Sequence, residues 1–410
     1  MRFIFCIIGV LLYSGLSAQQ MSVLSTDSTY NIVRELQEVV VTAEKRELNP
    51  GDIPTALTVI TPRSIPGENN PDLRNISGIV PNFYMQEGGL KLSTPLYIRG
   101  IGTVSGTPPV GLYVDGVPVF DKNAFVFDLY DIRQIEVLRG PQTTLYGRNS
   151  INGLININTN PPSNVFAAQV KIGYSSYRSQ NYNLVLNLPW KRLYNKLSFS
   201  YNKSEGYFKN HYEQDRKSNP SDSYNIRYQG NVFTGNNCEI GFGINFNHSF
   251  DGGYAYAAID SLKVHRYTVN YNIPSSYKRD LLSSYLNLKK KWQRLAFNTV
   301  TSYSRTQDRQ MLDADFTYLD VFDNGKKSRQ NLLTQEFNIQ SNENRHVDWT
   351  AGAFGFYKDL TNRYLATFGK DKAYLLPMAL DNAKYHNNTV TWGIAGYGQV
   401  TLKEIWPGMS

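Results

Sequence analysis

Beyond Pro161-Pro162, apolar and polar side chains alternate with a period of two, and this limits what the chain can fold into more than any other feature. Strict alternation is the pattern of a β-strand with one apolar and one polar face. In the first such run, 166–174, Val170 and Ile172 share one face and Lys171 lies on the other. The pattern recurs in the segments 182–188, 197–201, 224–232, 240–246, 295–303, 333–340, 349–357 and 390–402. We therefore expect about ten to twelve strands, joined by alternately short and long connections.

Two architectures fit such strands, and composition helps to separate them. Aromatic residues make up 13% of the chain, with 29 Tyr and 20 Phe, yet the mean hydropathy is −0.40. After the N-terminal segment, no apolar run approaches the roughly 20 residues that a membrane-spanning helix needs. A transmembrane barrel presents every second side chain to lipid, so a hydrophilic average with many aromatics is typical of it. A secreted β-sandwich would bury the same apolar face and remains the alternative from alternation alone.

Lys171 and Arg227 indicate which way the strands of a barrel would face. Both lie among the polar members of their alternating runs. A charge at the lipid midplane costs roughly 2–4 kcal/mol. The polar side chains are therefore expected to face the lumen and the aromatic ones the lipid.

Residues 1–18 have the composition of a signal peptide. Arg2 precedes an apolar stretch from Phe3 to Leu16, and the small residue Ala18 stands at the expected cleavage point. The stretch is too short to span a membrane as a helix, which predicts an exported protein. Cys6 lies in the signal, so the mature chain keeps only Cys238 and forms no internal disulfide.

Residues 19–50 are predicted to form a flexible tether with one apolar segment inside it. The first part, 19–35, is rich in Gln, Ser and Thr and has no periodic pattern. The segment 36–43 is rich in β-branched residues and has charged neighbours. An isolated strand of this kind suits β-augmentation, in which a partner's sheet edge supplies the missing hydrogen bonds. An edge strand of the following domain fits these residues equally well.

Residues 51–161 are predicted to form a compact α+β domain. Strands are expected at 55–60, 96–100, 112–116, 132–138 and 153–158. Asn70-Pro71 is expected to begin a helix that places Leu73, Ile76 and Val80 on one face. A shorter helix is expected to begin at Gly140-Pro141 and to end at Gly147.

Within this domain, the run IEVLRGPQTTLYG at 135–147 closely resembles the plug signature of TonB-dependent outer-membrane receptors. The following residues, RNSINGLININT at 148–159, complete it. Upstream, YIRG at 97–100 and VDGVP at 114–118 match two further landmarks of that family in the expected order. Several ordered matches are more specific than a single short motif. The signature residues are Arg99, Gly100, Asp115, Gly116, Arg133, Glu136, Arg139, Gly140, Pro141, Tyr146, Gly147, Arg148 and Gly153.

The resemblance also implies a role for the tether and a fold class. The apolar segment resembles the TonB box, which pairs with an inner-membrane energy transducer and would consist of Glu38, Val39, Val40, Val41, Thr42 and Ala43. The implied fold is an all-β transmembrane antiparallel barrel with an N-terminal α+β plug domain. Plugged transporters of this kind have about 22 strands. Residues 162–410 would supply about half of them, so we interpret the chain as truncated.

The function implied is active import of a scarce, bulky ligand, a ferric siderophore or similar iron complex, across the bacterial outer membrane. No carboxypeptidase-like extension precedes the box, which favours the iron-complex branch over the glycan branch. Asn152 departs from the family pattern, which often has Gly there. The alternatives are a truncated product without function and a passive porin-like channel. A signalling receptor would need a further folded domain ahead of Glu38.

Charged plug residues are candidates for ion pairs that position the plug against the barrel wall. Ordinary surface charge is the alternative for each of them. The candidates are Arg99, Arg133, Glu136, Arg139 and Arg148.

Extracellular ligand contacts are expected on plug loops and on long barrel loops. The plug candidates are Met85, Gln86, Glu87, Gly88, Thr103 and Ser105, and the barrel candidates are Tyr254, Tyr256 and Tyr318. These tyrosines also suit an interfacial aromatic girdle, which we prefer.

We expect no cofactor, no metal site, no nucleic-acid partner and no enzymatic chemistry. The five histidines are isolated in sequence, and no Gly-x-Ser-x-Gly elbow occurs. The spacing in Gly100–Gly106 does not match a dinucleotide-binding loop. The densest basic cluster, Lys289-Lys290-Lys291 with Arg294, is interpreted as a solvated turn between two alternating runs.

Overall fold

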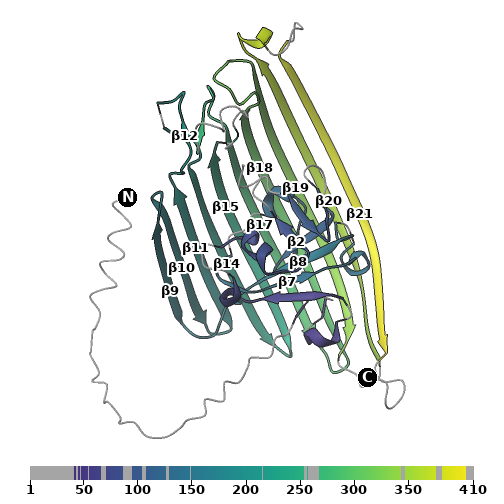
Figure 1. The fold of residues 1–410 in the computed structure, drawn as a ribbon. Helices are drawn as coiled ribbons and strands as arrows, with labels where there is room; N and C mark the ends of the chain where they lie inside the picture. Colours follow the sequence, from purple (N-terminus) through teal and green to yellow (C-terminus); the bar gives the residue numbers. More distant parts are fainter. Residues whose placement is uncertain are drawn as a thin grey trace, which may run out of the picture. The chain divides into compact units, whose positions relative to one another are not determined.

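The computed structural model describes residues 41–402, apart from 43–44, 47, 54, 66–70, 86–94, 104–107, 126–128, 148, 215, 254–255, 257–266, 343–346 and 375–380. The predicted signal peptide, residues 19–40 of the predicted tether, and Ala43 lie outside the described residues. The described strands form a ten-stranded sheet, a five-stranded sheet and two sheets of three strands (Figure 1). None of the described helices combines the length and the apolar character needed to cross a membrane.

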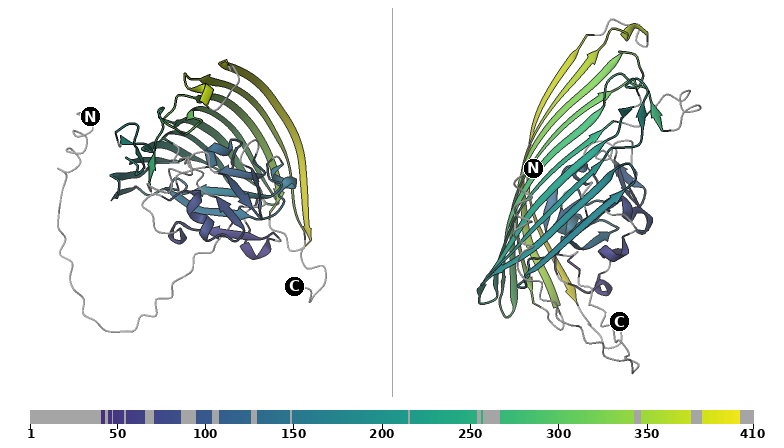
Figure 2. Two further views of the ribbon diagram at one scale, coloured as in Figure 1. Left: turned by 45° about the horizontal axis from the view of Figure 1, so that its top comes forward. Right: turned by 90° about the vertical axis from the view of Figure 1, so that its left-hand side faces the viewer.

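The ten-stranded sheet pairs its strands in an antiparallel ladder, in chain order from β9 to β21. Figure 2 shows this sheet as a curved surface. Its strands are β9 (Ala167–Ser175), β10 (Ser179–Trp190), β11 (Leu193–Ser204), β14 (Ser221–Gly235), β15 (Cys238–Gly252), β17 (Ser276–Lys291), β18 (Leu295–Asp313), β19 (Phe322–Ser341), β20 (Val347–Phe368) and β21 (Ala383–Leu402). The short strands β12 (Lys209–Asn210), β13 (Arg216–Lys217) and β16 (Thr268–Val269) form a separate sheet, and the 3-10 helix η5 spans Lys372–Tyr374.

The two faces of the large sheet differ as the alternation predicts. On one face, polar side chains are buried, among them Ser198, Asn225 and Arg227. On the other, apolar side chains are exposed, including Ile226 and Trp392. Because Arg227 is only 3% exposed and lies over the Tyr130 ring, the polar face is the one that contacts the plug.

One strand of the large sheet, β17, was not predicted. Its sequence places Leu281 beside Leu282 and Ser283 beside Ser284, which interrupts the alternation. Leu281 is apolar on the plug-facing side because it lines a pocket with Val117 and Phe120 of the plug. The prediction that Lys289-Lys290-Lys291 forms a turn is also wrong. These residues end β17 and pair with β18, Lys289 and Lys290 also pair with β15, and the turn follows at 292–294.

The plug is built on a mixed sheet with the strand order β1-β7-β8-β5-β6. The strands β5 and β8 pair in parallel, and the other neighbours are antiparallel. The five strands are β1 (Leu57–Ile60), β5 (Val110–Val114), β6 (Val117–Val119), β7 (Ile132–Leu138) and β8 (Gly153–Thr159). A second small sheet contains β2 (Phe83–Met85), β3 (Leu96–Ile98) and β4 (Ile101–Thr103). The short helices are η1 (Pro50–Asp52), η2 (Pro62–Ser64), η3 (Leu73–Gly78), η4 (Lys122–Phe125) and α2 (Thr143–Tyr146).

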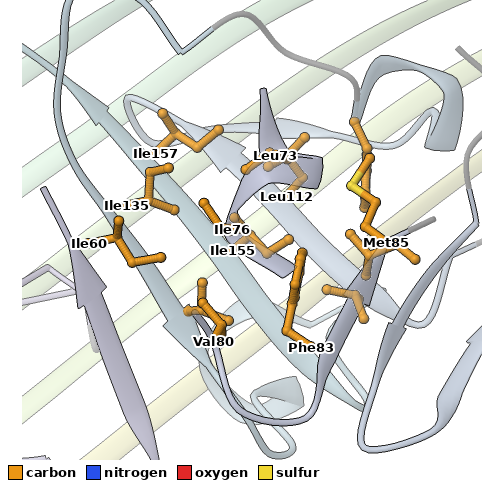
Figure 3. Close-up of a cluster of buried hydrophobic side chains, with 14 of the residues drawn as sticks. Ile60, Leu73, Ile76, Val80, Phe83, Met85, Leu112, Ile135, Ile155 and Ile157 are labelled. Atoms are coloured by element: carbon orange, nitrogen blue, oxygen red, sulfur yellow. The ribbon is translucent and has the colours of Figure 1, made fainter. Parts of the chain in front are cut away.

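An apolar core joins the two plug sheets to η3. Ile135 and Ile155 contribute from adjacent strands of the larger sheet, and Phe83 from the smaller one (Figure 3). Leu73, Ile76 and Val80 are buried as predicted, but the helix that carries the first two is a 3-10 helix. Its cap is Asp72 and not Asn70, because the Asp72 side chain accepts from the Arg74 amide in a capping box.

Candidate functional site

At Val41, inside the predicted TonB box, the chain pairs with the residue Leu48 that follows the box. The backbone groups of Val41 and Leu48 exchange two hydrogen bonds, each of 2.9 Å. The Lys45 amide donates to the Thr42 carbonyl, and Lys45 has a left-handed φ of 62°. We call this turn, whose described residues are 41, 42, 45, 46 and 48, the seated loop. The prediction that a flexible tether extends to residue 50 is therefore wrong for this loop.

The seated loop is anchored in the plug by an apolar side chain at its start. Val41 is completely buried and belongs to a cluster with Tyr113, Leu138 and Tyr146 of the plug. Burying a side chain of this size contributes roughly 1.5–3 kcal/mol. Val41 is thus committed to the plug core, although the sequence suggested a strand available for a partner.

Glu136 is the polar anchor of the same loop. It lies on β7 and is 0% exposed. Its carboxylate accepts from the Thr42 amide at 3.0 Å, and it also accepts from the side-chain amides of three plug residues. Those amide nitrogens lie at 2.6 Å for Gln134, 3.0 Å for Asn156 and 2.8 Å for Asn158. Glu136 was predicted to pair with the barrel wall, but it holds the loop within the plug instead.

Lys45 and Arg46 connect the seated loop to the large sheet. The Lys45 Nζ atom lies 2.8 Å from Glu336 Oε1 on β19, and Arg46 Nη2 lies 3.4 Å from Asp348 Oδ2 on β20. The side chains of both pairs are at most 13% exposed. Lys45 Nζ also lies 4.2 Å from the centroid of the Tyr146 ring. Burial lowers the pKa of Lys45 from its ordinary value, and the Glu336 carboxylate opposes this shift.

The seated loop therefore touches both parts of the described fold. Its backbone and Val41 are held by the plug, and its two cationic side chains are held by the sheet. The sequence shows charged residues after the box but does not indicate their partners. Their partners are about three hundred positions away in the chain, at Glu336 and Asp348.

The plug docks on the sheet through residues that the sequence analysis did not select. Asp131 and Lys196 form an ion pair of 2.7 Å, with side chains 4% and 1% exposed. Ser198 donates to the same carboxylate at 2.7 Å. Next to it, the Tyr130 hydroxyl donates to Asn225 Oδ1 at 2.9 Å.

The predicted docking residues lie elsewhere. Arg133 is exposed, and Arg139 donates to the Pro81 carbonyl inside the plug. Arg99 has a left-handed φ of 52° beside Gly100 in the turn between β3 and β4. Arg148 lies outside the described residues. Buried ion pairs thus do connect plug and sheet, but they do not involve the predicted residues that the structure describes, and for Arg148 the prediction stays untested.

Other signature residues form turns or connect elements. Gly100, Gly116 and Gly147 have φ values of 77°, 79° and 61°, which a side chain rarely tolerates. Gly147 ends α2 as predicted, but α2 begins at Thr143 after an N-cap at Gln142 and not at Gly140-Pro141. The Asp115 carboxylate accepts from the Thr159 amide at 2.8 Å and from Gln229 of the sheet at 3.2 Å.

Gly153 provides a test of the plug core. A Cβ atom at this position would lie 2.6 Å from the Leu138 carbonyl oxygen and 2.9 Å from Ile98 Cδ1. We expect Gly153→Ala to destabilise the plug by roughly 1–3 kcal/mol, because a backbone atom must move. Gly78→Ala is the matched control, since nothing lies within 4 Å of its Cβ position. Hydrogen exchange of β7 and β8 measures the effect, and equal protection in both variants would contradict it.

The predicted ligand-binding residues are only partly described. Met85 is 3% exposed and packs in the plug core, so its prediction as a ligand contact is wrong. In β2 the exposed side chain is that of its neighbour Tyr84. Thr103 ends β4, whereas Gln86, Glu87, Gly88, Ser105 and Tyr254 lie outside the described residues. Tyr256 and Tyr318 are 44% and 59% exposed.

Comparison with known proteins identifies the class. Residues 49–154 match the family model described as the TonB-dependent receptor plug domain. The chain thus carries the plug of a TonB-dependent receptor, followed by a sheet with the fold of the barrel of these receptors. Over 107 residues it is 37% identical to the pesticin receptor of Yersinia enterocolitica, which covers 25% of this chain and 16% of that protein. Over 117 residues it is 28% identical to the catecholate siderophore receptor Fiu of Escherichia coli K12, covering 28% and 14%.

Solved structures show the same fold over most of the chain. The ferric yersiniabactin uptake receptor FyuA of Yersinia pestis aligns with a TM-score of 0.68 at 18% identity, covering 84% of this chain and 62% of that one. The receptor in the FpvAI–pyocin S2 complex aligns with a TM-score of 0.73 at 13% identity, covering 88% and 50%. The chain spans only a minor part of the curated relatives that it matches. The predicted class, fold and outer-membrane location are confirmed, and these relatives are receptors rather than enzymes.

Proposed function

We propose that this chain takes part in energy-dependent import of a scarce, bulky ligand across the outer membrane, an iron–siderophore complex being the first candidate. The resemblance to a catecholate siderophore receptor and to a ferric yersiniabactin uptake receptor supports the ligand class. The observation that carries the proposal is the seated loop, which attaches the end of the predicted TonB box to both plug and sheet.

In this proposal the energy transducer pairs with residues 38–43 by β-augmentation, beginning at residues 38–40 and extending to Val41 and Thr42 as they leave the seated loop. Tension on that segment acts first on the Thr42–Glu136 hydrogen bond and then on the ion pairs of Lys45 and Arg46. A local opening costs less free energy than unfolding of the domain. Release of the loop would free the plug from one of its attachments to the sheet and open a path for the ligand.

The pairing of the box with the transducer can be tested by one substitution. Val40→Pro removes a backbone donor and fixes φ, so we expect it to abolish capture of the chain by the periplasmic domain of the transducer. Val33→Pro is the control, because it places the same residue in the polar part of the tether. Binding is measured on the purified chain in detergent, and capture of the Val40→Pro chain at the level of the control would overturn the pairing.

The alternatives predict different results. A passive porin-like channel would let small solutes leak from liposomes without the transducer, whereas a plug held by the seated loop should keep leakage low. A product without function would fail to bind both the transducer and ferric siderophores, although its plug would still fold.

A further inference from the structure

The connection between β18 and β19, residues 314–321, contacts the plug through an aromatic side chain. Phe316 packs against the apolar core of the plug, and its ring centroid lies 5.2 Å from that of Tyr256 in the connection 253–275. Phe316 has a left-handed φ of 53°, which is rare for a bulky residue. Its amide donates to Asp313 Oδ1 at 2.9 Å. The Asp313 carboxylate therefore holds the turn that places this ring on the plug.

Asp313 lies opposite a second carboxylate in the sheet. It ends β18, and the register pairs it with Asp323 near the start of β19. Directly opposed residues share one face of a sheet, with Cβ atoms roughly 4.5–5.5 Å apart, and like charges there are destabilising. The two residues are 0% and 9% exposed, and Asp313 Oδ2 has no hydrogen-bond partner among the described residues. We call Asp313 and Asp323 the carboxyl pair.

The groups around the carboxyl pair add negative charge. Asp315 in the connection repels both members of the pair. Asp320 repels one of them, and its amide donates to Asp371 Oδ2 at 3.0 Å. Tyr271, ahead of β17, contributes a buried phenol, whereas Lys370 contacts Asp320 through its backbone amide and has an exposed side chain. Within the described ranges, no lysine or arginine forms a salt bridge with any of these carboxylates.

These surroundings favour the neutral form of both carboxyl groups. Burial, followed by repulsion from Asp315, raises the pKa of Asp313 to about 7, although hydrogen bonds from the Phe316 and Ile273 amides oppose the shift. Burial and the neighbouring carboxylates raise the pKa of Asp323 to about 6. Both values lie above the ordinary value of 3.8, so ionisation weakens the folded arrangement. The arrangement is thus most stable below about pH 4 and loses stability as the pH rises to about 7.

The carboxyl pair lies outside the membrane-spanning part of the sheet. Its end of the sheet carries the long connections 205–220, 253–275 and 369–382, and the other end carries the short ones at 191–192, 236–237 and 292–294. Outer-membrane barrels place their long loops outside the cell. Asp313 also lies ten residues beyond the exposed Tyr303, with Arg305 and Arg309 between them. That distance is roughly 30 Å along a strand, so the external medium sets the protonation of the pair.

We propose that protons bound by the carboxyl pair keep the β18–β19 connection on the plug, and that their loss at higher external pH releases it. A protonated carboxyl group can donate a hydrogen bond to the ionised one, which would remove the repulsion between them. A proton fits better than a metal ion, because no three described His, Cys, Asp or Glu side chains are placed to hold one. It fits better than an organic cation because both carboxyl groups are buried. Release would move Phe316 away from the plug.

The test follows residue 316 by fluorine NMR on the purified full-length chain in neutral detergent micelles, with para-fluorophenylalanine in place of Phe316. The intensities of the packed and released signals give the ratio of released to seated connection. Each carboxyl group that is neutral only in the seated state changes this ratio about tenfold per pH unit. Between pH 5 and 8 we expect a change of about 1,000-fold, about 100-fold from Asp313 and about tenfold from Asp323.

Three variants provide matched comparisons. Asp313→Asn/Asp323→Asn keeps the size of both side chains but cannot ionise, so the ratio should stay constant with pH. Asp323→Asn keeps the acceptor of the Phe316 amide and should leave a change of at most about 100-fold. Asp381→Asn removes an exposed carboxylate from the connection 369–382 and should respond like the unmodified chain.

Three outcomes would overturn the inference. They are a packed signal that persists unchanged from pH 5 to 8, a double variant that responds like the unmodified chain, and loss of the response in Asp381→Asn. If the double variant is released at every pH, Asp323→Asn decides: a reduced response supports the inference, and a full response overturns it. The measurement uses neither the transducer nor an iron complex, so its failure leaves the proposed function untouched.

Discussion

Glu136→Leu is expected to release the seated loop and to destabilise the plug by roughly 3–5 kcal/mol. The substitution leaves the Thr42 amide and the side-chain amides of Gln134, Asn156 and Asn158 without their common acceptor. All of these donors are at the plug interior, where an unpaired polar group is costly. Hydrogen exchange should show rapid exchange of residues 41–48 together with weaker protection of β8.

The matched control for this substitution lies on the same strand. Arg133→Leu changes an exposed charged residue of β7 and should leave both regions protected. If Glu136→Leu also leaves the loop protected, then Val41 burial and the two cationic side chains hold the loop without the carboxylate. That result would remove Glu136 from the proposed path of tension.

Lys196→Met is expected to be the most damaging single change at the contact between plug and sheet. It leaves the Asp131 carboxylate, which is 4% exposed, without its cation. Breaking one side of a buried pair costs roughly 3–5 kcal/mol, more than the intact pair contributes. Thermal unfolding should begin at a lower temperature, and exchange near Asp131 and Asn160 should rise.

A double substitution separates loss of the pair from loss of packing. Lys196→Met/Asp131→Asn removes both charges and should recover part of the stability. Lys203→Met alters an exposed lysine of the same strand and serves as the control. A Lys196→Met chain that unfolds like the Lys203→Met chain would show that the ion pair does not hold the plug.

The sequence predicted the positions of the strands better than it predicted their lengths. Alternation located the run 295–303, but β18 continues to Asp313, and the run 333–340 is only the last part of β19. The parts of β18 and β19 that were not predicted are 304–313 and 322–332. They lie beyond the exposed apolar residues of the outward face, where the side chains on both faces of the sheet are mostly polar. Hydropathy no longer alternates there, although the backbone ladder continues unchanged.

The site was harder to predict because its contacts are distant in sequence. Glu136 was selected as a charged signature residue, but only the register of β7 and β8 brings Asn156 beside it. Lys196 appears in the sequence as one more polar residue of an alternating strand, and nothing near it indicates Asp131. Local patterns report which face a residue occupies, whereas a buried pair depends on how two separately folded elements meet.

The position of β1 determines how the plug would respond to force. This strand follows the seated loop and η1 directly, and it occupies the edge of the five-stranded sheet, where β7 is its only neighbour among the described strands. A force applied from the N-terminal side acts on β1, which is hydrogen-bonded to a neighbouring described strand on one side only. Such a strand peels away while β7, β8, β5 and β6 stay paired. Pulling would thus remove β1 and leave the rest of the plug folded. The plug would close again when β1 pairs with β7 once more.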